Sequence, residues 1–146
     1  MANHVRQQIR EYFGINLNNL TTTGTRVHES RVYPLDSLPA LAIYTKSETS
    51  EPLVMHTDRV MQRDLNVVVE GYAKATSNFD DTIDTICKEV EEAITADTTL
   101  GGLAKDTYLE STEIEFNAEG EQPLGFVSLT FLTTYHVKET NPDVAV

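Results

Sequence analysis

Two kinds of hydrophobic spacing divide the chain into predicted helices and strands. From Phe79 to Ile94, apolar residues recur every three or four positions, which predicts an amphipathic helix over 77–97. Residues 3–14 show the same spacing, with Asn3 as the expected cap and Gly14 as the expected end. Each predicted helix has one apolar face, so each needs a surface to pack against.

Five further stretches have the composition and spacing of β-strands. The stretch "LPALAIYT" is almost continuously apolar, which favours a central strand covered on both faces. Elsewhere apolar and polar residues alternate, as in a strand with one buried face. The first strand is expected to end at Pro34, because proline cannot donate to a ladder. The predicted strands are 26–33, 38–45, 63–75, 107–116 and 125–137.

The resulting order, α-β-β-β-α-β-β, indicates one α+β domain over residues 1–138. We expect a mainly antiparallel or mixed β-sheet with the two amphipathic helices on one face. The turn "NAEGEQP" is expected to join the last two strands as a hairpin. Residues 139–146 are expected to form a flexible C-terminal tail.

A long polar segment, residues 46–63, separates the second and third predicted strands. It becomes apolar towards its far end, and is expected to protrude either as an extended arm or as a hairpin. Methionine adapts to irregular surfaces, and arginine is enriched at protein interfaces. The candidates for a subunit interface in this segment are Leu53, Met55, Arg59, Met61 and Arg63.

Charge is unevenly distributed along the chain, which has a net charge of -12. Residues 1–63 contain seven basic and six acidic residues, including all six arginines, whereas the rest contains four lysines and seventeen acids. A solvated acidic surface would explain this, and so would a head-to-tail oligomer in which arginines meet a neighbour's carboxylates. The acidic candidates for that interface are Glu113, Glu115 and Glu121. Specific binding of nucleic acid by the acidic part is not expected.

Candidate chemistry is sparse. The four histidines occupy four different predicted elements, and none has the i, i+4 spacing of a helical metal site. Cys87 lies on the apolar stripe of the second helix, where Asp84 and Glu91 would oppose thiolate formation. In the strand 107–116, Glu113 and Glu115 are expected to share one face and Glu110 the other. We therefore predict no catalytic residue, no cofactor and no metal ligand, and expect a protein that is not an enzyme.

The 146 residues are sufficient for one ordinary core, and a single cysteine excludes an internal disulfide. No apolar window is long enough for a membrane span, and the first residues do not have the pattern of a secretion signal. We therefore expect no membrane partner and folding in the cytoplasm where the protein is made.

Three stretches, in order, cover almost the whole chain: "SRVYPLDSLPALAIYTKSE", "LNVVVEGYAKATSNFDDTIDTICKEVEEAITADTTLGGLAKD" and "TEIEFNAEGEQPLGFVSLTFLTTY". Together they resemble the tail terminator family of long-tailed bacteriophages, the minor tail protein U type. The most specific pieces are "RVYPL" with "LPAL", "VVEGYAKA", and "DTTLGGLAKD" followed by "STEIE". These pieces mark turns and strand ends, so the resemblance carries over no functional residue.

The resemblance implies an α+β fold and a structural role in the virion. Members of this family form a hexameric ring on the head-proximal end of the tail tube, stop its polymerisation, and provide the surface for head–tail joining. The implied partners are further copies of the chain, the major tail tube protein and the head-completion or connector protein, with DNA only as cargo passing through the lumen.

Two other functions remain open at the level of sequence. One is a related neck or tail-completion protein, or a component of a secretion tube. The other, from a different class, is a small hydrolase that uses the acidic helix 77–97.

Overall fold

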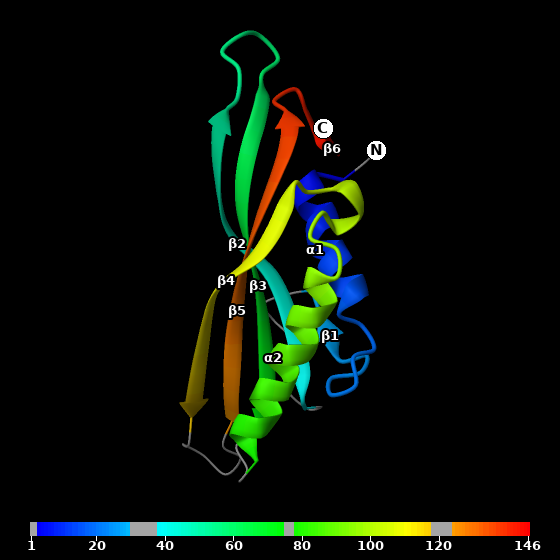
Figure 1. Ribbon diagram of the computed structural model, residues 1–146, viewed down its shortest axis with the longest axis vertical. Helices are drawn as coiled ribbons and strands as arrows, with labels where there is room; N and C mark the ends of the chain where they lie inside the picture. Colours follow the sequence, from blue (N-terminus) through cyan, green and yellow to red (C-terminus); the bar gives the residue numbers. More distant parts are fainter. Residues whose placement is uncertain (1–2, 30–37, 75–77, 118–123) are drawn as a thin grey trace.

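A curled, mixed β-sheet and two helices make up the domain (Figure 1). The computed structural model describes residues 3–29, 38–74, 78–117 and 124–146. The elements follow the order α-β-β-β-α-β-β-β, which confirms the predicted α+β class and adds one strand. They are α1 (Val5–Asn16), β1 (Val27–His28), β2 (Ala40–Pro52), β3 (Val60–Lys74), α2 (Phe79–Thr95), a short 3₁₀ turn (Leu100–Gly102), β4 (Asp106–Asn117), β5 (Leu124–Lys138) and β6 (Asn141–Ala145).

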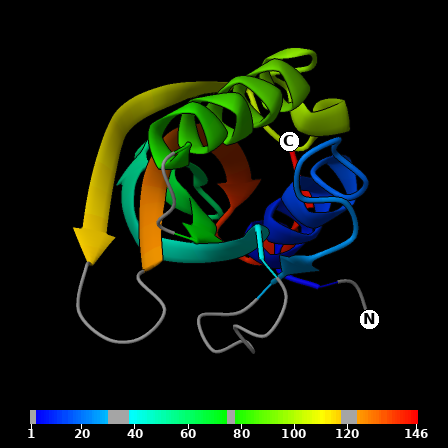
Figure 2. The same cartoon turned by 90° about the horizontal axis from the view of Figure 1, so that it is seen from below.

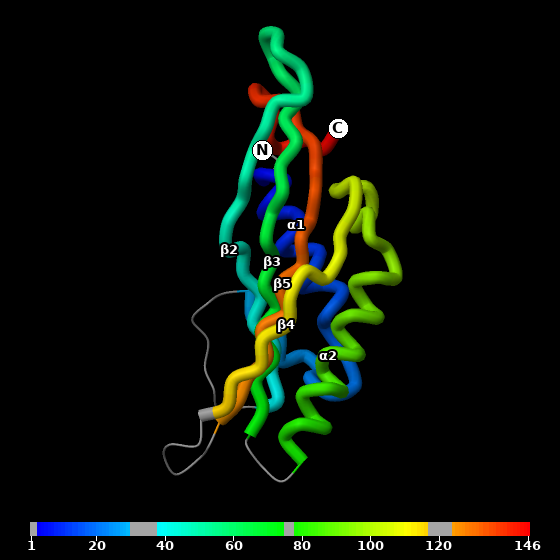
Figure 3. Tube along the Cα trace, turned by 60° about the vertical axis from the view of Figure 1, so that its left-hand side comes forward, coloured from blue at the N-terminus to red at the C-terminus, as the bar shows by residue number. Residues whose placement is uncertain are grey.

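The strands are arranged in the order β1-β2-β3-β5-β4, and β6 pairs with the end of β5. Only the pair β1–β2 is parallel; the other pairs are antiparallel. Seen from below, the sheet curls around both helices (Figure 2), and the long strands twist strongly along their length (Figure 3). The sheet therefore has an inner face towards the helices and an outer face away from them.

The core lies between the inner face of the sheet and the apolar stripes of the helices. In β5, every second residue from Gly125 to Val137 is buried, as alternation in a strand with one covered face requires. From α1 the core receives Val5, Ile9 and Phe13. From α2 it receives Phe79, Ile83, Ile86, Val90 and Ile94.

Two glycines allow α2 to lie close against the sheet. A Cβ atom on Gly125 would lie 2.1 Å from the ring of Phe79, and one on Gly71 would lie 2.9 Å from a methyl carbon of Ile86. Any larger side chain would push the helix away from β3 and β5. The beginning of α2 is thereby fixed on the inner face of the sheet.

β2 and β4 each contain a β-bulge. The register shifts between Thr45 and Ser47 in β2, and between Leu109 and Ser111 in β4, so Lys46 and Glu110 are extra residues. A bulge moves the following residues to the opposite face from the one that uninterrupted alternation would give. In β2 it turns Glu48 towards the inner face.

Residues 46–63 form the outer part of a long β-hairpin made of β2 and β3. Backbone pairing continues from Ser47↔Asn66 to Pro52↔Met61, and the Leu53 amide donates to the Val60 carbonyl at 2.9 Å. The hairpin extends beyond the rest of the molecule at one end (Figure 1).

Several boundaries differ from the sequence prediction. The first helix is capped by the Nδ1 atom of His4, which accepts from the Arg6 amide, and it continues past Gly14 to Asn16. The predicted flexible tail, 139–146, contains β6, whose residues pair with Val137 and Lys138. The end of the first predicted strand and the turn 117–123 lie largely outside the described residues.

Candidate functional site

The tip of the β2–β3 hairpin presents apolar side chains to solvent. Leu53 is 46% exposed and Met55 79% exposed. Both residues lie in the connection between the strands, where Asp58 adopts a positive φ of 57° and helps turn the chain. Exposed large apolar residues at a projecting tip are typical of a contact surface. Met61 lies one pair below the tip, opposite Pro52.

The tip is also tied to the turn between β5 and β6. Arg59 Nη1 lies 3.3 Å from Glu139 Oε2, and Lys138 Nζ lies 3.8 Å from Asp58 Oδ2. Thr140 Oγ1 donates to Asp58 Oδ1. Exposed ion pairs of this kind contribute little stability, about 0–1 kcal/mol. Within the chain, Arg59 is therefore held only by a weak, exposed ion pair.

Arg63 lies in a different setting, on the inner face near the base of the hairpin. Its side chain is 17% exposed, and its Nη1 atom lies 3.8 Å from Glu48 Oε2 and 3.0 Å from His4 Nε2. Arg6 Nη1 also approaches Glu48 Oε2, at 2.7 Å, and the hydroxyl of Tyr135 donates to Glu48 Oε1. We call Glu48, Arg6, Arg63, His4 and Tyr135 the Glu48 cluster. Within the chain, Arg63 is a structural residue.

Burial and neighbouring charges shift the pKa values of two members of the Glu48 cluster, Tyr135 and His4. Burial, with the hydrogen bond to Glu48 and the charge of Glu48, raises the pKa of Tyr135. Burial and the charges of Arg6 and Arg63 lower the pKa of His4, against a smaller raising effect of Glu48. At neutral pH, His4 is therefore neutral, and its Nδ1 atom can accept the capping hydrogen bond.

The acidic interface candidates occupy β4, at one edge of the sheet. Glu113 and Glu115 share the outer face, opposite Ser128 and Phe126 of β5. The prediction that Glu110 lies on the other face of the strand is wrong. The bulge at Glu110 brings its side chain to the outer face, where Glu110 and Glu113 line the same groove. Glu121 lies outside the described residues.

β4 also carries exposed aromatic and aliphatic residues that the sequence analysis did not select. Tyr108, Ile114 and Phe116 are each at least half exposed. Phe116 makes an edge-to-face contact with Phe79, with ring centroids 5.4 Å apart. The sequence shows that Ile114 and Phe116 alternate with Glu113 and Glu115. It does not show that α2 leaves this edge of the sheet uncovered.

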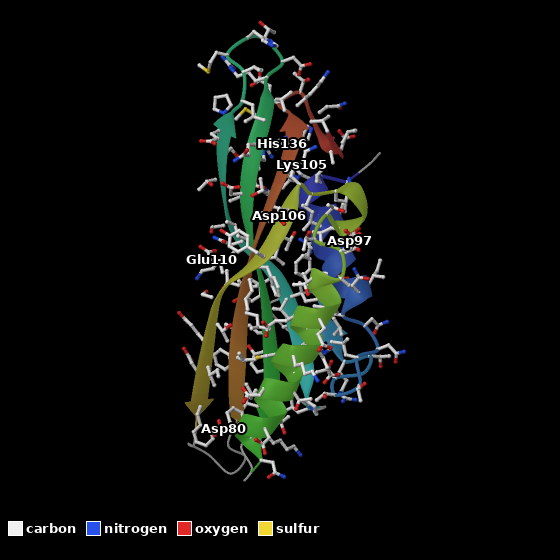
Figure 4. All side chains as sticks on the ribbon, viewed as in Figure 1. Asp80, Asp97, Lys105, Asp106, Glu110 and His136 are labelled. Carbon is white, nitrogen blue, oxygen red and sulfur yellow. The ribbon has the colours of Figure 1, made fainter. Side chains whose placement is uncertain are left out.

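A second polar group lies on the outer face near the beginning of β4. Figure 4 shows Lys105 near His136, with Asp106 and then Glu110 farther along β4. Burial and Lys105 lower the pKa of His136, whose Nε2 atom lies 3.4 Å from Gln62 Oε1. Among the described residues, no three His, Cys, Asp or Glu side chains are placed to hold a metal ion.

Cys87 is half-buried on α2 and packs against the core. Burial, then Glu91 and Asp84, raise the pKa of its thiol to about 11. The two acids are those expected from the sequence to oppose thiolate formation. A thiol held in its protonated form is a weak nucleophile.

No helix within the described residues has the length and apolarity needed to cross a membrane. In comparisons with known proteins, the chain matches no protein-family model and no curated protein.

Proposed function

We propose that the chain is a ring-forming tail terminator, a virion structural protein that caps the head-proximal end of a phage tail tube. The observation that carries the proposal is the projecting β2–β3 hairpin with Leu53 and Met55 exposed at its tip. An apolar tip at the end of a projecting hairpin suits a subunit that contacts a neighbour. The sequence resemblance to the tail terminator family and the α+β fold that it implies support the same function.

In this proposal, both helices lie on the inner face of the sheet and the hairpin is the protruding arm. A closed ring joins one surface of each subunit to a different surface of the next. The acidic edge strand β4 supplies one surface, with Glu113 and Glu115. Arg59 at the hairpin supplies the basic partner on the other surface, while Arg63 is engaged in the Glu48 cluster.

The ring, by resemblance a hexamer, stops tube polymerisation and presents a surface to the head-completion or connector protein. Its other partner is the major tail tube protein, and DNA passes through its lumen without specific binding. The protein acts by assembly and not by catalysis. It folds in the host cytoplasm and ends in the virion, at the head-proximal end of the tail.

The test is assembly of the purified protein, followed by sedimentation and negative-stain microscopy. The wild type is expected to form closed rings of uniform size, alone or on added tail tubes. The double variant Leu53→Ser with Met55→Ser should remain a folded monomer. Ile15, which is 75% exposed on α1, provides the matched control, and Ile15→Ser should assemble normally.

The alternative functions would give different particles in negative-stain microscopy. A secretion-tube component would polymerise into open tubes of varying length, which contradicts a terminator. Rings that form equally well from the Leu53/Met55 double variant would remove the hairpin tip from the interface. A wild-type protein that stays monomeric and does not bind tail tubes would contradict the proposal as a whole.

A further inference from the structure

The two bulges lie at the same level of the sheet and hollow its outer face. The bulge in β2 follows Thr45, which pairs with Val67, and the bulge in β4 follows Leu109, which pairs with Phe131. Val67 and Phe131 pair with each other, so both extra residues lie beside one cross-strand row. Bulges bend strands and increase their twist. The result is a groove of about 310 Å³ lined by β2, β3, β5 and β4, which we call the bulge groove.

Opposite charges stand at the two ends of the bulge groove. Lys46 lies on β2, and Glu110 and Glu113 lie on β4. β3 and β5 separate them, so the path along the sheet covers three strand spacings, about 15 Å. Among the described residues, none of these three side chains forms an ion pair. The charges are therefore available to a ligand.

The floor of the bulge groove is neutral and polar. Asn66 donates from its amide nitrogen to Ser47 Oγ at 2.8 Å, whereas its Oδ1 atom is shielded from water and accepts no hydrogen bond from any described residue. The hydroxyl groups of Ser128 and Thr130 lie on the same floor. These hydroxyl groups can donate to or accept from the backbone of an extended occupant.

We propose that the bulge groove binds an extended segment of a partner protein that carries a basic and an acidic side chain about four residues apart. An extended chain rises about 3.3 Å per residue, so this spacing matches the span of the groove. The basic side chain pairs with Glu110 and Glu113, the acidic side chain pairs with Lys46, and the backbone between them forms hydrogen bonds with the hydroxyl groups of Ser128 and Thr130. The lining carries a net charge of -1, which disfavours a polyanion such as nucleic acid. The bulge groove does not include the hairpin tip, but it shares Glu113 with the β4 surface proposed for the ring, so the groove is tested by peptide binding, which does not require assembly.

The probe is a blocked five-residue peptide with arginine first, glutamate last and Ser-Thr-Ser between them, titrated into the ¹⁵N-labelled full chain. The expected result is a set of amide shift changes confined to the groove, around Ser47, Asn66 and Thr130. Two otherwise identical peptides, with arginine or glutamate at both ends, should bind about two- to fivefold more weakly, because each loses one exposed ion pair. Shift changes outside the groove, or none, would overturn the proposal.

Charge reversals test both ends of the groove. Lys46→Glu, and separately Glu110→Lys with Glu113→Lys, should each weaken binding of the mixed peptide at least about fivefold. The combined triple variant reverses the polarity of the groove, and should recover binding because the peptide can lie in the opposite direction. Lys46→Gln serves as the milder variant if Lys46→Glu does not fold.

The matched control changes the same charges elsewhere. Asp84→Lys with Glu92→Lys alters two exposed acids on α2 and should leave peptide binding unchanged. If the peptide with two arginines binds as tightly as the mixed peptide, the groove is only an acidic patch and the proposal is wrong. Failure of peptide binding does not decide the ring proposal, because ring assembly is tested separately with the Leu53/Met55 double variant.

Discussion

At the scale of single residues, Glu48 organises the polar part of the interior. It accepts hydrogen bonds from Arg6 and Tyr135, and Arg63 lies within ion-pair distance. These partners come from α1, β3 and β5, so one carboxylate joins three elements at the base of the hairpin. Removing one partner of such a group leaves the others shielded and unsatisfied.

The two arginines near the hairpin should therefore respond differently to charge reversal. Arg63→Glu places a second carboxylate beside Glu48 and should lower the free energy of unfolding by roughly 3 kcal/mol or more. Arg59→Glu replaces the exposed pair with Glu139 by an exposed like-charge contact and should lower it by about 1 kcal/mol or less. Urea unfolding of both variants measures the difference. Equal values would show that Arg63 is not part of a structural cluster.

His4 should make the stability of the protein sensitive to mild acid. Its pKa is lowered from 6.5 in the folded state, so the unfolded chain binds the proton more readily. Its contribution is therefore fully present above pH 6.5 and is lost as the pH falls towards the folded-state pKa. Protonation also removes the acceptor that caps α1 and adds a third positive charge beside Arg6 and Arg63.

The measurement is the urea midpoint of unfolding between about pH 8 and pH 5. His4→Asn keeps a capping side chain that does not titrate, and should flatten part of the acid-side decrease. His136, whose pKa burial and Lys105 also lower, acts in the same direction, so His136→Asn is the parallel control. An unchanged pH profile in His4→Asn would contradict this role of His4.

Residue-scale features were predictable only where the partners are close in sequence. Asp84 and Glu91 lie within four positions of Cys87, and their effect on the thiol follows from helical spacing alone. The role of His4 could not be predicted, because Glu48 and Arg63 are far along the chain and meet it only in the folded sheet. One of these partners, Glu48, faces His4 because of the bulge in β2, which leaves no mark in a hydrophobic pattern.

At the scale of elements, periodicity predicted the parts whose faces are clearly divided. α2, β3 and β5 appear where the apolar spacing placed them. β6 was missed because "NPDVA" has no alternation, and it is held by partners far away in sequence. It pairs with β5, Gln8 of α1 donates to the Asp143 carbonyl, and Ala145 packs against the core. The bulges were missed because each adds a single residue and reverses the faces beyond it, which turns Glu48 inward and brings Glu110 beside Glu113.

The domain should fold without the tip of the hairpin. Pro52 and Met61 are paired, so replacing residues 53–60 with Asn-Gly would close the strands with a two-residue turn. The replacement removes exposed apolar contacts, surface ion pairs and the last backbone pairing of the hairpin with the end of β5, so the thermal midpoint should shift by less than about 5 °C. Ring formation should be lost. Normal rings from the shortened chain would show that the tip makes no essential contact.

At the scale of the whole molecule, charge opposes assembly. Each subunit carries a net charge of -12, and the excess of acids lies in residues 64–146, which include the edge strand β4. In a ring, repulsion acts between whole subunits, whereas attraction through Arg59 involves single exposed pairs. A negative lumen would also keep passing DNA from binding.

Salt should therefore favour the ring. The Debye length shortens from about 30 Å at 0.01 M to about 8 Å at 0.15 M, which screens repulsion between distant charges. Each exposed Arg–carboxylate pair contributes only about 0–1 kcal/mol, so its loss at moderate salt is the smaller effect. Sedimentation across this range should show the fraction of rings increasing. Asp84→Asn with Glu92→Gln removes two exposed acids from α2, and should shift ring formation to lower salt. Rings that dissociate as salt rises would show that the interfacial ion pairs outweigh the repulsion.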